Sequence, residues 1–209
     1  MTIEQLSRKR TGILISGRGS NMAALIAAAR ADDYPASIAL VISNVPVAQG
    51  IARAAAAGVE TRTIDHRAFN KDRQAFEKAI DAALSAHGVD LICLAGFMRR
   101  LTPWLVRRWQ GRMLNIHPSL LPLYKGLHTH ERAIADHAKL HGASVHFVTE
   151  GLDEGPVIAQ SAVPVLASDT PETLAARVLE IEGPLYAAAL RFVASGTAHL
   201  NGDEAVFGS

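Results

Sequence analysis

The chain has 209 residues, of which 49% are hydrophobic and 20% are charged. Such a composition allows a large buried core and excludes a disordered or fibrous protein. The 21 basic and 20 acidic residues nearly balance, and no basic run extends beyond residues 8–10. We therefore expect no nucleic-acid partner.

The single cysteine, Cys93, lies inside the apolar run of residues 90–96. It has no disulfide partner within the chain, so we expect a small buried side chain in a reducing, cytoplasmic setting. We find no targeting signal in residues 1–10 and no apolar stretch of about 18 residues, as a membrane span requires. We expect residues 1–209 to form a single domain, with a flexible N-terminus at 1–10 and a C-terminal tail at 200–209.

Strand-like and helix-like segments alternate through the first half of the chain, which is typical of βαβ units on a parallel sheet. In chain order the pattern predicts a strand at 11–16, a helix at 22–31, a strand at 37–43, a helix at 48–57, a strand at 59–64, a helix at 69–87, and strands at 90–95 and 113–117. The predicted fold class is therefore α/β.

The second half begins with an irregular segment, residues 118–126, which contains two prolines and ends in glycine. Loops of this length are often functional. After it we predict a helix near 130–139, an antiparallel pair of strands at 143–149 and 156–165, and a closing helix at 171–194 with apolar residues at helical spacing.

The loop Gly17-Arg-Gly-Ser-Asn21 lies between the first predicted strand and helix, where backbone N–H groups and the helix dipole favour an anion. It is a candidate phosphate site. It lacks the lysine of a Walker loop, and the third glycine of a dinucleotide fingerprint would fall at Met22. The alternative is an ordinary turn with Ser20 or Asn21 as the helix cap.

Asn115 and His117 are two residues apart at the end of a predicted strand, so their side chains share a face. In open α/β sheets this end of the strand faces the ligand. An amide beside an imidazole suits a developing oxyanion, as in acyl transfer. The alternative is a polar strand end with His117 capping the loop.

Asp153 lies between the last two predicted strands, where aspartate and glycine are also ordinary turn residues. Five histidines stand at positions 128, 130, 137, 141 and 146. No carboxylate or cysteine joins them at a recognisable ligand spacing, so we expect no metal. Arg73 and Glu182 fall on helix faces that look exposed, where a solvated charge is the ordinary interpretation.

Six segments together resemble the phosphoribosylglycinamide formyltransferase family, folate-dependent enzymes of purine synthesis. They are Ile15-Ser-Gly-Arg-Gly-Ser-Asn21, Leu94-Ala-Gly-Phe-Met-Arg99, Leu114-Asn-Ile-His-Pro-Ser-Leu-Leu-Pro122, Gly126-Leu-His-Thr-His130, Gly142-Ala-Ser-Val-His-Phe-Val-Thr149 and Leu152-Asp-Glu-Gly-Pro156. The resemblance covers residues from about 12 to 190. It implies a Rossmann-like open sheet of about seven strands, mostly parallel with an antiparallel C-terminal part, and helices on both faces.

The resemblance also implies roles for individual residues. The catalytic group would be Asn115, His117 and Asp153. The ribonucleotide site would consist of Gly19, Ser20 and Asn21 at the phosphate and Glu182 at the amine. The folate site would consist of Arg73, Met98, Arg99, Arg100, Leu101 and Asn115.

One loop departs from the family pattern of a basic residue followed by Tyr-Pro-Gly. Leu123 stands at the basic position and Lys125 at the proline position. The departure lies outside the implied catalytic group.

The reaction implied by the resemblance transfers the formyl group of 10-formyltetrahydrofolate to the amine of 5'-phosphoribosylglycinamide. Asn115 and a protonated His117 would stabilise the oxyanion, and Asp153 would keep His117 charged and help a proton to leave. The implied partners are these two small molecules, with no metal, and the chain is expected to be a monomer or weak homodimer. Related formyltransferases and deformylases are one alternative, but they carry an additional domain for which we expect no room in this chain. An inert nucleotide-sensing domain is another alternative, but it would need no catalytic group.

Overall fold

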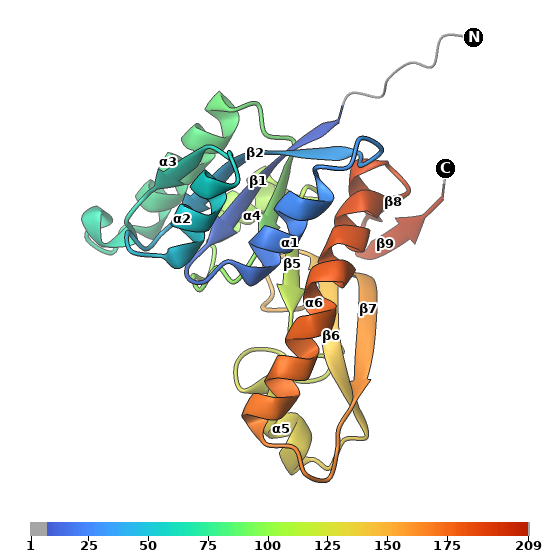
Figure 1. Cartoon of the computed structure of the whole chain (residues 1–209). Helices are drawn as coiled ribbons and strands as arrows, with labels where there is room; N and C mark the ends of the chain where they lie inside the picture. The colour runs from blue at the N-terminus through green and yellow to red at the C-terminus, as the bar shows by residue number, and fades with distance from the viewer. Residues whose placement is uncertain (1–7, 209) are drawn as a thin grey trace.

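The computed structural model describes residues 8–208 and contains a seven-stranded sheet with helices on both faces (Figure 1). The strand order is β3-β2-β1-β4-β5-β6-β7. The strands are β1 (Lys9–Ile15), β2 (Ala36–Ser43), β3 (Thr61–Thr63), β4 (Leu91–Leu94), β5 (Met113–His117), β6 (Leu140–Phe147) and β7 (Val157–Pro164). The first five are parallel, and β6 and β7 are antiparallel to their neighbours. The expected mixed sheet is confirmed.

The chain order of the strands creates a crevice at the centre of the sheet. From β1 the chain moves outward to β2 and β3, then returns to place β4 on the other side of β1. Crossovers leave in opposite directions from β1 and β4, so the loops that follow these two strands diverge. In open α/β sheets this switch point is where ligands bind.

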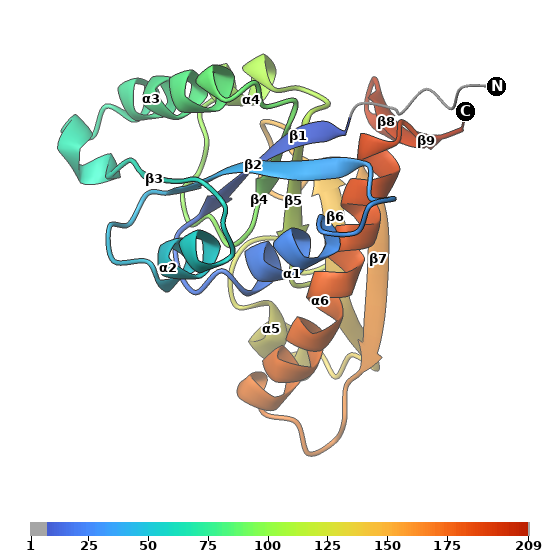
Figure 2. The ribbon, with the colours of Figure 1, turned by 45° about the horizontal axis from the view of Figure 1, so that its top comes forward.

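Helices cover the two faces unequally, as Figure 2 shows. One face carries α1 (Ser20–Ala28), α2 (Gln49–Ala56), α5 (Thr129–Ala135) and α6 (Pro171–Ala194), and the other carries α3 (Arg73–Ala86) and α4 (Pro103–Arg108). In β4 the side chains alternate between the two cores: Cys93 packs with the first group and Leu94 with the second. A central strand buried on both faces explains the continuous apolar run around Cys93.

Left-handed residues set two helix boundaries that differ from the prediction. The helix predicted at 69–87 begins at Arg73, because Asn70 and Lys71 have φ values of 49° and 69° and Asp72 then caps the helix through Ala75 N–H. A short 3₁₀ turn, η1 (His66–Phe69), precedes it. The helix predicted near 130–139 ends at Ala135, since His137 has a φ of 53°. Helix α4 was not predicted.

Both chain ends differ from the expected flexible N-terminus and C-terminal tail. Residues 1–7 lie outside the described part, but Lys9 and Arg10 belong to β1, and Arg10 N–H donates to Asp90 Oδ2 at 2.8 Å. Residues 200–209 were expected as a tail, yet β8 (Ala198–Asn201) and β9 (Glu204–Phe207) pair as a hairpin. Phe207 packs edge-on against Phe192 of α6, with ring centroids 5.7 Å apart, and this apolar contact holds the hairpin.

Within residues 8–208, no helix is long and apolar enough to cross a membrane. No group of three or more His, Cys, Asp or Glu side chains in the same range is arranged to hold a metal ion.

Candidate active site

The loop after β1 and the start of α1 form a first cavity, which we call the loop cavity. It is lined by Ser16, Gly17, Arg18, Gly19, Ser20, Asn21, Ala95, Gly96 and Met98. Gly19 is the N-cap of α1, with a φ of 71°, and no side chain caps the helix. The backbone N–H groups of the first turn therefore remain free for an anion, and the predicted alternative, a cap by Ser20 or Asn21, is not observed.

The tight turn at Gly19 depends on glycine. A Cβ atom there would lie 3.0 Å from Met22 Cε and 3.1 Å from Gly50 Cα, and the positive φ disfavours any L side chain. Gly50 N–H in turn donates to Gly17 O at 3.0 Å. The loop is thus held against α2 with its N–H groups exposed to the cavity.

A second hollow, which we call the α4 cleft, lies on the α4 side of the sheet. It is lined by Leu94, Phe97, Arg99, Arg100, Leu101, Val106, Asn115, His146, Val148, Thr149, Glu150, Gly151, Leu152 and Asp153. Arg107 of α4 pairs with Glu150 at 2.6 Å across its rim. Of the residues predicted for folate, Arg99, Arg100, Leu101 and Asn115 line this cleft.

Two other predicted folate residues lie elsewhere. Met98 lines the loop cavity and is 71% exposed. Arg73 does not line either hollow, but its guanidinium donates to the carbonyl oxygen of Arg100. Arg73 therefore contacts the backbone of Arg100, which lines the cleft, without lining the cleft itself.

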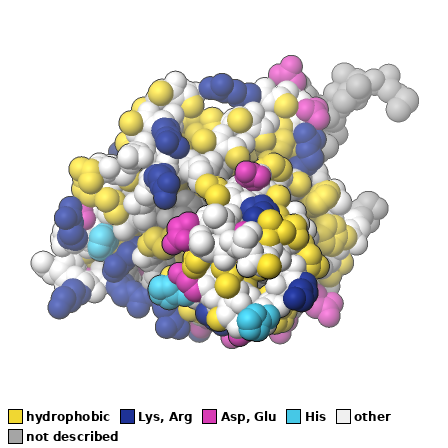
Figure 3. All heavy atoms as spheres, turned by 60° about the horizontal axis from the view of Figure 1, so that its bottom comes forward, with side chains coloured by type: hydrophobic (Ala, Val, Ile, Leu, Met, Phe, Trp, Pro, Cys, Tyr) yellow, Lys and Arg dark blue, Asp and Glu magenta, His cyan; other side chains and the backbone are white. Residues whose placement is uncertain are grey.

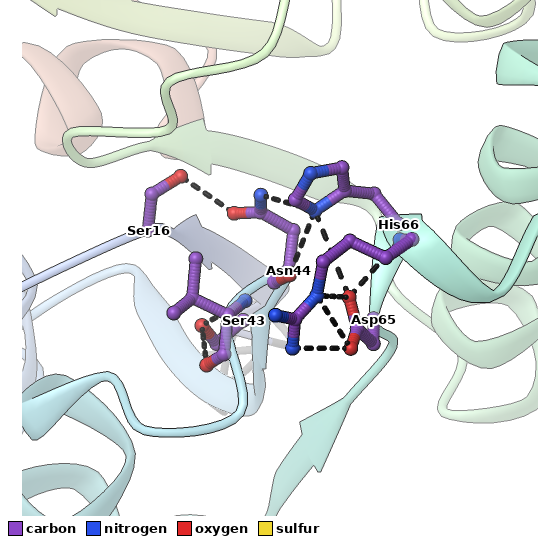
Figure 4. A network of polar contacts seen from close by, with 7 residues as sticks. Ser16, Ser43, Asn44, Asp65 and His66 are labelled. Carbon is purple, nitrogen blue, oxygen red and sulfur yellow. Dashed lines mark hydrogen bonds and ion pairs between the residues drawn. The ribbon is translucent and has the colours of Figure 1, made fainter. Parts of the chain in front are cut away.

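Ser16 holds the chain in place between the two hollows through hydrogen bonds of its side chain. Figure 4 shows the bond from Ser16 to Asn44. The Ser16 hydroxyl donates to Asn44 Oδ1 at 2.6 Å and accepts from Met98 N–H at 2.8 Å. Asn44 is 2% exposed, and its amide nitrogen lies 3.2 Å from His66 Nδ1. A buried, hydrogen-bonded amide is costly to move, so this network anchors the chain where the two hollows meet.

Asn115, His117 and Asp153 come together at the carboxyl end of β5. His117 Nδ1 lies 3.4 Å from Asp153 Oδ2, and both side chains are less than 10% exposed. Asp153 Oδ2 also accepts from Gly126 N–H at 2.9 Å. Asp153 has a φ of 52°, so a residue expected in a turn sits in strained backbone with its carboxylate buried.

Both ring nitrogens of His117 face acceptors. Nε2 lies 2.9 Å from Tyr124 O, and Nδ1 faces the Asp153 carboxylate. A ring with a proton on each nitrogen satisfies both contacts. The long loop that contains Tyr124 therefore takes part in orienting His117.

His146 was not predicted as a site residue, although it belongs to the same cluster. It is 2% exposed; its Nδ1 lies 2.9 Å from Phe147 O and its Nε2 lies 3.1 Å from Asn115 Nδ2. Burial lowers the pKa of His146, so the neutral ring can donate from Nδ1 and accept from Asn115 through Nε2. One amide hydrogen of Asn115 is thereby fixed and the other remains available. The position of His146 on β6, opposite Asn115, could have been predicted from the antiparallel pairing of β5 with β6.

Glu182 was predicted on an exposed-looking helix face, but it lies against the loop cavity. Its Oε2 accepts from Asn21 Nδ2 at 2.6 Å. Burial raises the pKa of Glu182, and the Asn21 hydrogen bond and the nearby His117 lower it by less. A carboxylate thus lies beside the cavity and within electrostatic reach of His117.

Figure 3 views the end of the molecule that is at the bottom of Figure 1. Lys and Arg side chains gather along the left of this face, while acidic and histidine side chains lie nearer the middle.

In the loop that departs from the family pattern, Lys125 pairs with Glu154 at 3.1 Å, and both side chains are more than a third exposed. The pair ties this loop to the Asp153 turn without contacting Asn115 or His117.

Comparison with known proteins places the chain in a family. Residues 9–190 match the model of the formyl transferase family, to which the chain belongs. Among curated proteins, phosphoribosylglycinamide formyltransferase of Escherichia coli strain K12 is 44% identical over 184 residues, covering 88% of this chain and 86% of that protein. The human trifunctional purine biosynthetic protein adenosine-3 is 47% identical over 193 residues, which are 92% of this chain but 19% of that protein. The chain thus spans between 14% and 19% of the length of the trifunctional relatives it matches.

Among solved structures, phosphoribosylglycinamide formyltransferase from Brucella melitensis is 53% identical and superposes with a TM-score of 0.87. That match covers 91% of this chain and 97% of the other. The likeness thus extends over nearly the whole of a stand-alone enzyme.

Proposed function

We propose that the chain transfers the formyl group of 10-formyltetrahydrofolate to the amine of 5'-phosphoribosylglycinamide in de novo purine biosynthesis. The observation that carries this proposal is the meeting of Asn115, His117 and Asp153 beside the α4 cleft, with Glu182 hydrogen-bonded to Asn21 of the loop cavity. The names of the similar proteins support the same reaction.

In the proposed reaction the substrate amine attacks the formyl carbon, and the carbonyl oxygen becomes an oxyanion. The free amide hydrogen of Asn115 donates to that oxygen, and a protonated His117 stabilises it through its positive charge. Asp153, directly or through water, takes a proton from the attacking nitrogen; the bond from carbon to N10 of the folate then breaks and N10 gains a proton. The products are the N-formyl ribonucleotide and tetrahydrofolate, so atoms and charge balance without a metal or a covalent enzyme intermediate.

The two hollows suit the two substrates. The ribonucleotide phosphate would bind the free N–H groups at Gly19, Ser20 and Asn21, and Glu182 would hold the amine. The folate would occupy the cleft beside Asn115, with its wall formed by residues 99–101 and supported by Arg73.

We also propose that the chain acts as a single domain in the cytoplasm, as a monomer or weak homodimer. Its partners would be small molecules, with neither nucleic acid nor a membrane involved. The nearly balanced charge supports the proposal that no nucleic acid is involved. Sedimentation analysis over a range of protein concentrations tests the oligomeric state.

An ultraviolet assay of tetrahydrofolate release, with and without phosphoribosylglycinamide, tests the function. Release that requires the ribonucleotide supports the transferase. Release without it indicates a hydrolase, and no release in either case indicates an inert binding domain.

A further inference from the structure

One face of α3 presents three polar side chains toward the chain segment that runs from the α4 cleft into α4. Arg73, Glu77 and Asp81 are four residues apart, so they project from the same side of the helix. Arg73 donates to the carbonyl of Arg100, and Asp81 accepts from Trp109 Nε1 at 2.8 Å. Figure 2 shows α3 and α4 lying side by side.

Glu77, the middle residue, is a buried carboxylate with no part in the proposed reaction. It is 1% exposed. Thr102 N–H donates to its Oε1 at 2.7 Å, and the Thr102 hydroxyl donates to its Oε2. A carboxylate in the interior is stable only when such donors satisfy it, so the contact is strong and sensitive to displacement.

Thr102 shows that this contact takes precedence over local structure. It occupies the N-cap position of α4, where a threonine hydroxyl normally accepts from the first turn of the helix. Here no side-chain cap is formed, because the hydroxyl is turned to Glu77. The start of α4 is therefore held by α3 rather than by its own cap.

Thr102 directly follows the three residues that line the cleft, Arg99, Arg100 and Leu101. The segment is fixed at Met98 by Ser16, at Arg100 by Arg73 and at Thr102 by Glu77. Between these points the side chains project into the cleft. The Glu77 contact is the only one of the three made by a fully buried charged group.

We propose that Glu77 is a positioning residue for the folate: by holding Thr102 it sets the wall of the cleft at residues 99–101. The inference rests on the proposed function. It assigns Glu77 an effect on folate affinity, with no contact to either substrate and no effect on the ribonucleotide.

The test compares Glu77→Ala and Glu77→Gln with Asp81→Ala. Asp81 is a matched control, because it lies one turn further along the same face and binds the far end of α4 through Trp109 and Arg108. We measure kcat, the KM for each substrate, tetrahydrofolate binding by calorimetry, and the melting temperature. Thr102→Val, which keeps the N–H donor and removes the hydroxyl, gives a milder second probe.

Glu77→Ala is expected to raise the KM for 10-formyltetrahydrofolate and the dissociation constant for tetrahydrofolate by about tenfold or more, since a hydrogen-bonded buried charge is lost. Glu77→Gln, which can still accept from Thr102 N–H, should recover most of that affinity, and Thr102→Val should lose about threefold. The KM for the ribonucleotide should stay within about twofold in all variants. Asp81→Ala should lower the melting temperature without changing folate affinity.

Equal folate affinity in Glu77→Ala and the wild type overturns the inference, as does an equal loss in Asp81→Ala. If Glu77→Ala does not fold, Thr102→Val decides by the same comparison with Asp81→Ala. A wild type that neither releases nor binds tetrahydrofolate overturns the proposed function itself. A wild type that is active while the variants show no folate-specific change overturns the Glu77 inference alone.

Discussion

At the scale of single residues, Asp153 combines two features that a turn aspartate does not need. Its carboxylate is buried, and it lies beside two histidines. The same oxygen that faces His117 also accepts from Gly126 N–H. A group so constrained is held in place by its neighbours, which is common where charge is used in catalysis.

Asp153→Asn is expected to lower kcat by at least about a hundredfold, because an amide can neither take the proton from the attacking amine nor balance a charged His117. The melting temperature should change little, since asparagine keeps the size, can accept from Gly126 N–H and tolerates the positive φ. Glu154→Gln is the control: it removes the neighbouring, exposed carboxylate that pairs with Lys125. Turnover above about a third of the wild type in Asp153→Asn would return this residue to the role of an ordinary turn.

At the scale of helices and strands, the loop cavity depends on how closely α6 approaches α1. A Cβ atom on Gly183 would lie 2.8 Å from Ala24 Cβ, which is closer than packed side chains tolerate. Glu182 is the preceding residue, and its contact with Asn21 at the start of α1 needs this close approach. Gly183 therefore acts through helix packing on the position of a carboxylate in the site.

Gly183→Ala is expected to raise the KM for the ribonucleotide severalfold and leave the KM for the folate unchanged. The overpacking costs about 1–3 kcal/mol, and the gain in helix propensity offsets about 1 kcal/mol of it, so the melting temperature should fall only slightly. Adding Ala24→Gly restores the space, and the double variant should recover the affinity in steady-state kinetics. A double variant no better than the single one would show that α1 and α6 are not coupled in this way.

The elements with strong periodicity were predictable, and so were the parts of the site that end strands. The central parallel strands, the position of Asn115 beside His117 and the glycine loop all follow from local pattern. The burial of Glu182 does not follow from local pattern, because it depends on the close packing of α6 against α1 at Gly183. The position of Met98 at the loop cavity does not follow from local pattern either, because it is set by the Ser16 contact across the sheet. Such long-range packing leaves no mark in a short window of sequence.

At the scale of the whole molecule, stability should depend on pH through two buried histidines. Burial lowers the pKa of His146, and it lowers the pKa of His141 to about 4. His141 is fully buried, and its Nε2 lies 3.1 Å from His130 Nδ1. In the unfolded chain a histidine has a pKa of about 6.5, so between that value and the folded pKa the unfolded state binds more protons.

The contribution of these two histidines to the free energy of unfolding is therefore expected to be constant above about pH 7 and to fall as the pH drops from about 6.5 toward 4. His141→Gln should make the decline shallower, because the protonation of the unfolded chain at this site is lost. Denaturant titrations at a series of pH values measure this, with the exposed His128→Gln as the control. A slope unchanged by His141→Gln but altered by His128→Gln would contradict the assignment.

The reactivity of the single cysteine should report how often the folded chain opens at the centre of the sheet. Cys93 is fully buried in β4, and burial raises the pKa of its thiol to about 12. Thiolates, not thiols, react with disulfide reagents, so native protein should not be labelled at neutral pH on the timescale of a free thiol. Labelling would require the central strand to separate from its neighbours, and its rate would report how often the middle of the sheet opens. With labelling monitored by mass spectrometry, bound ribonucleotide and folate should each slow it, whereas rapid labelling of the native protein would show that β4 opens far more often than its burial implies.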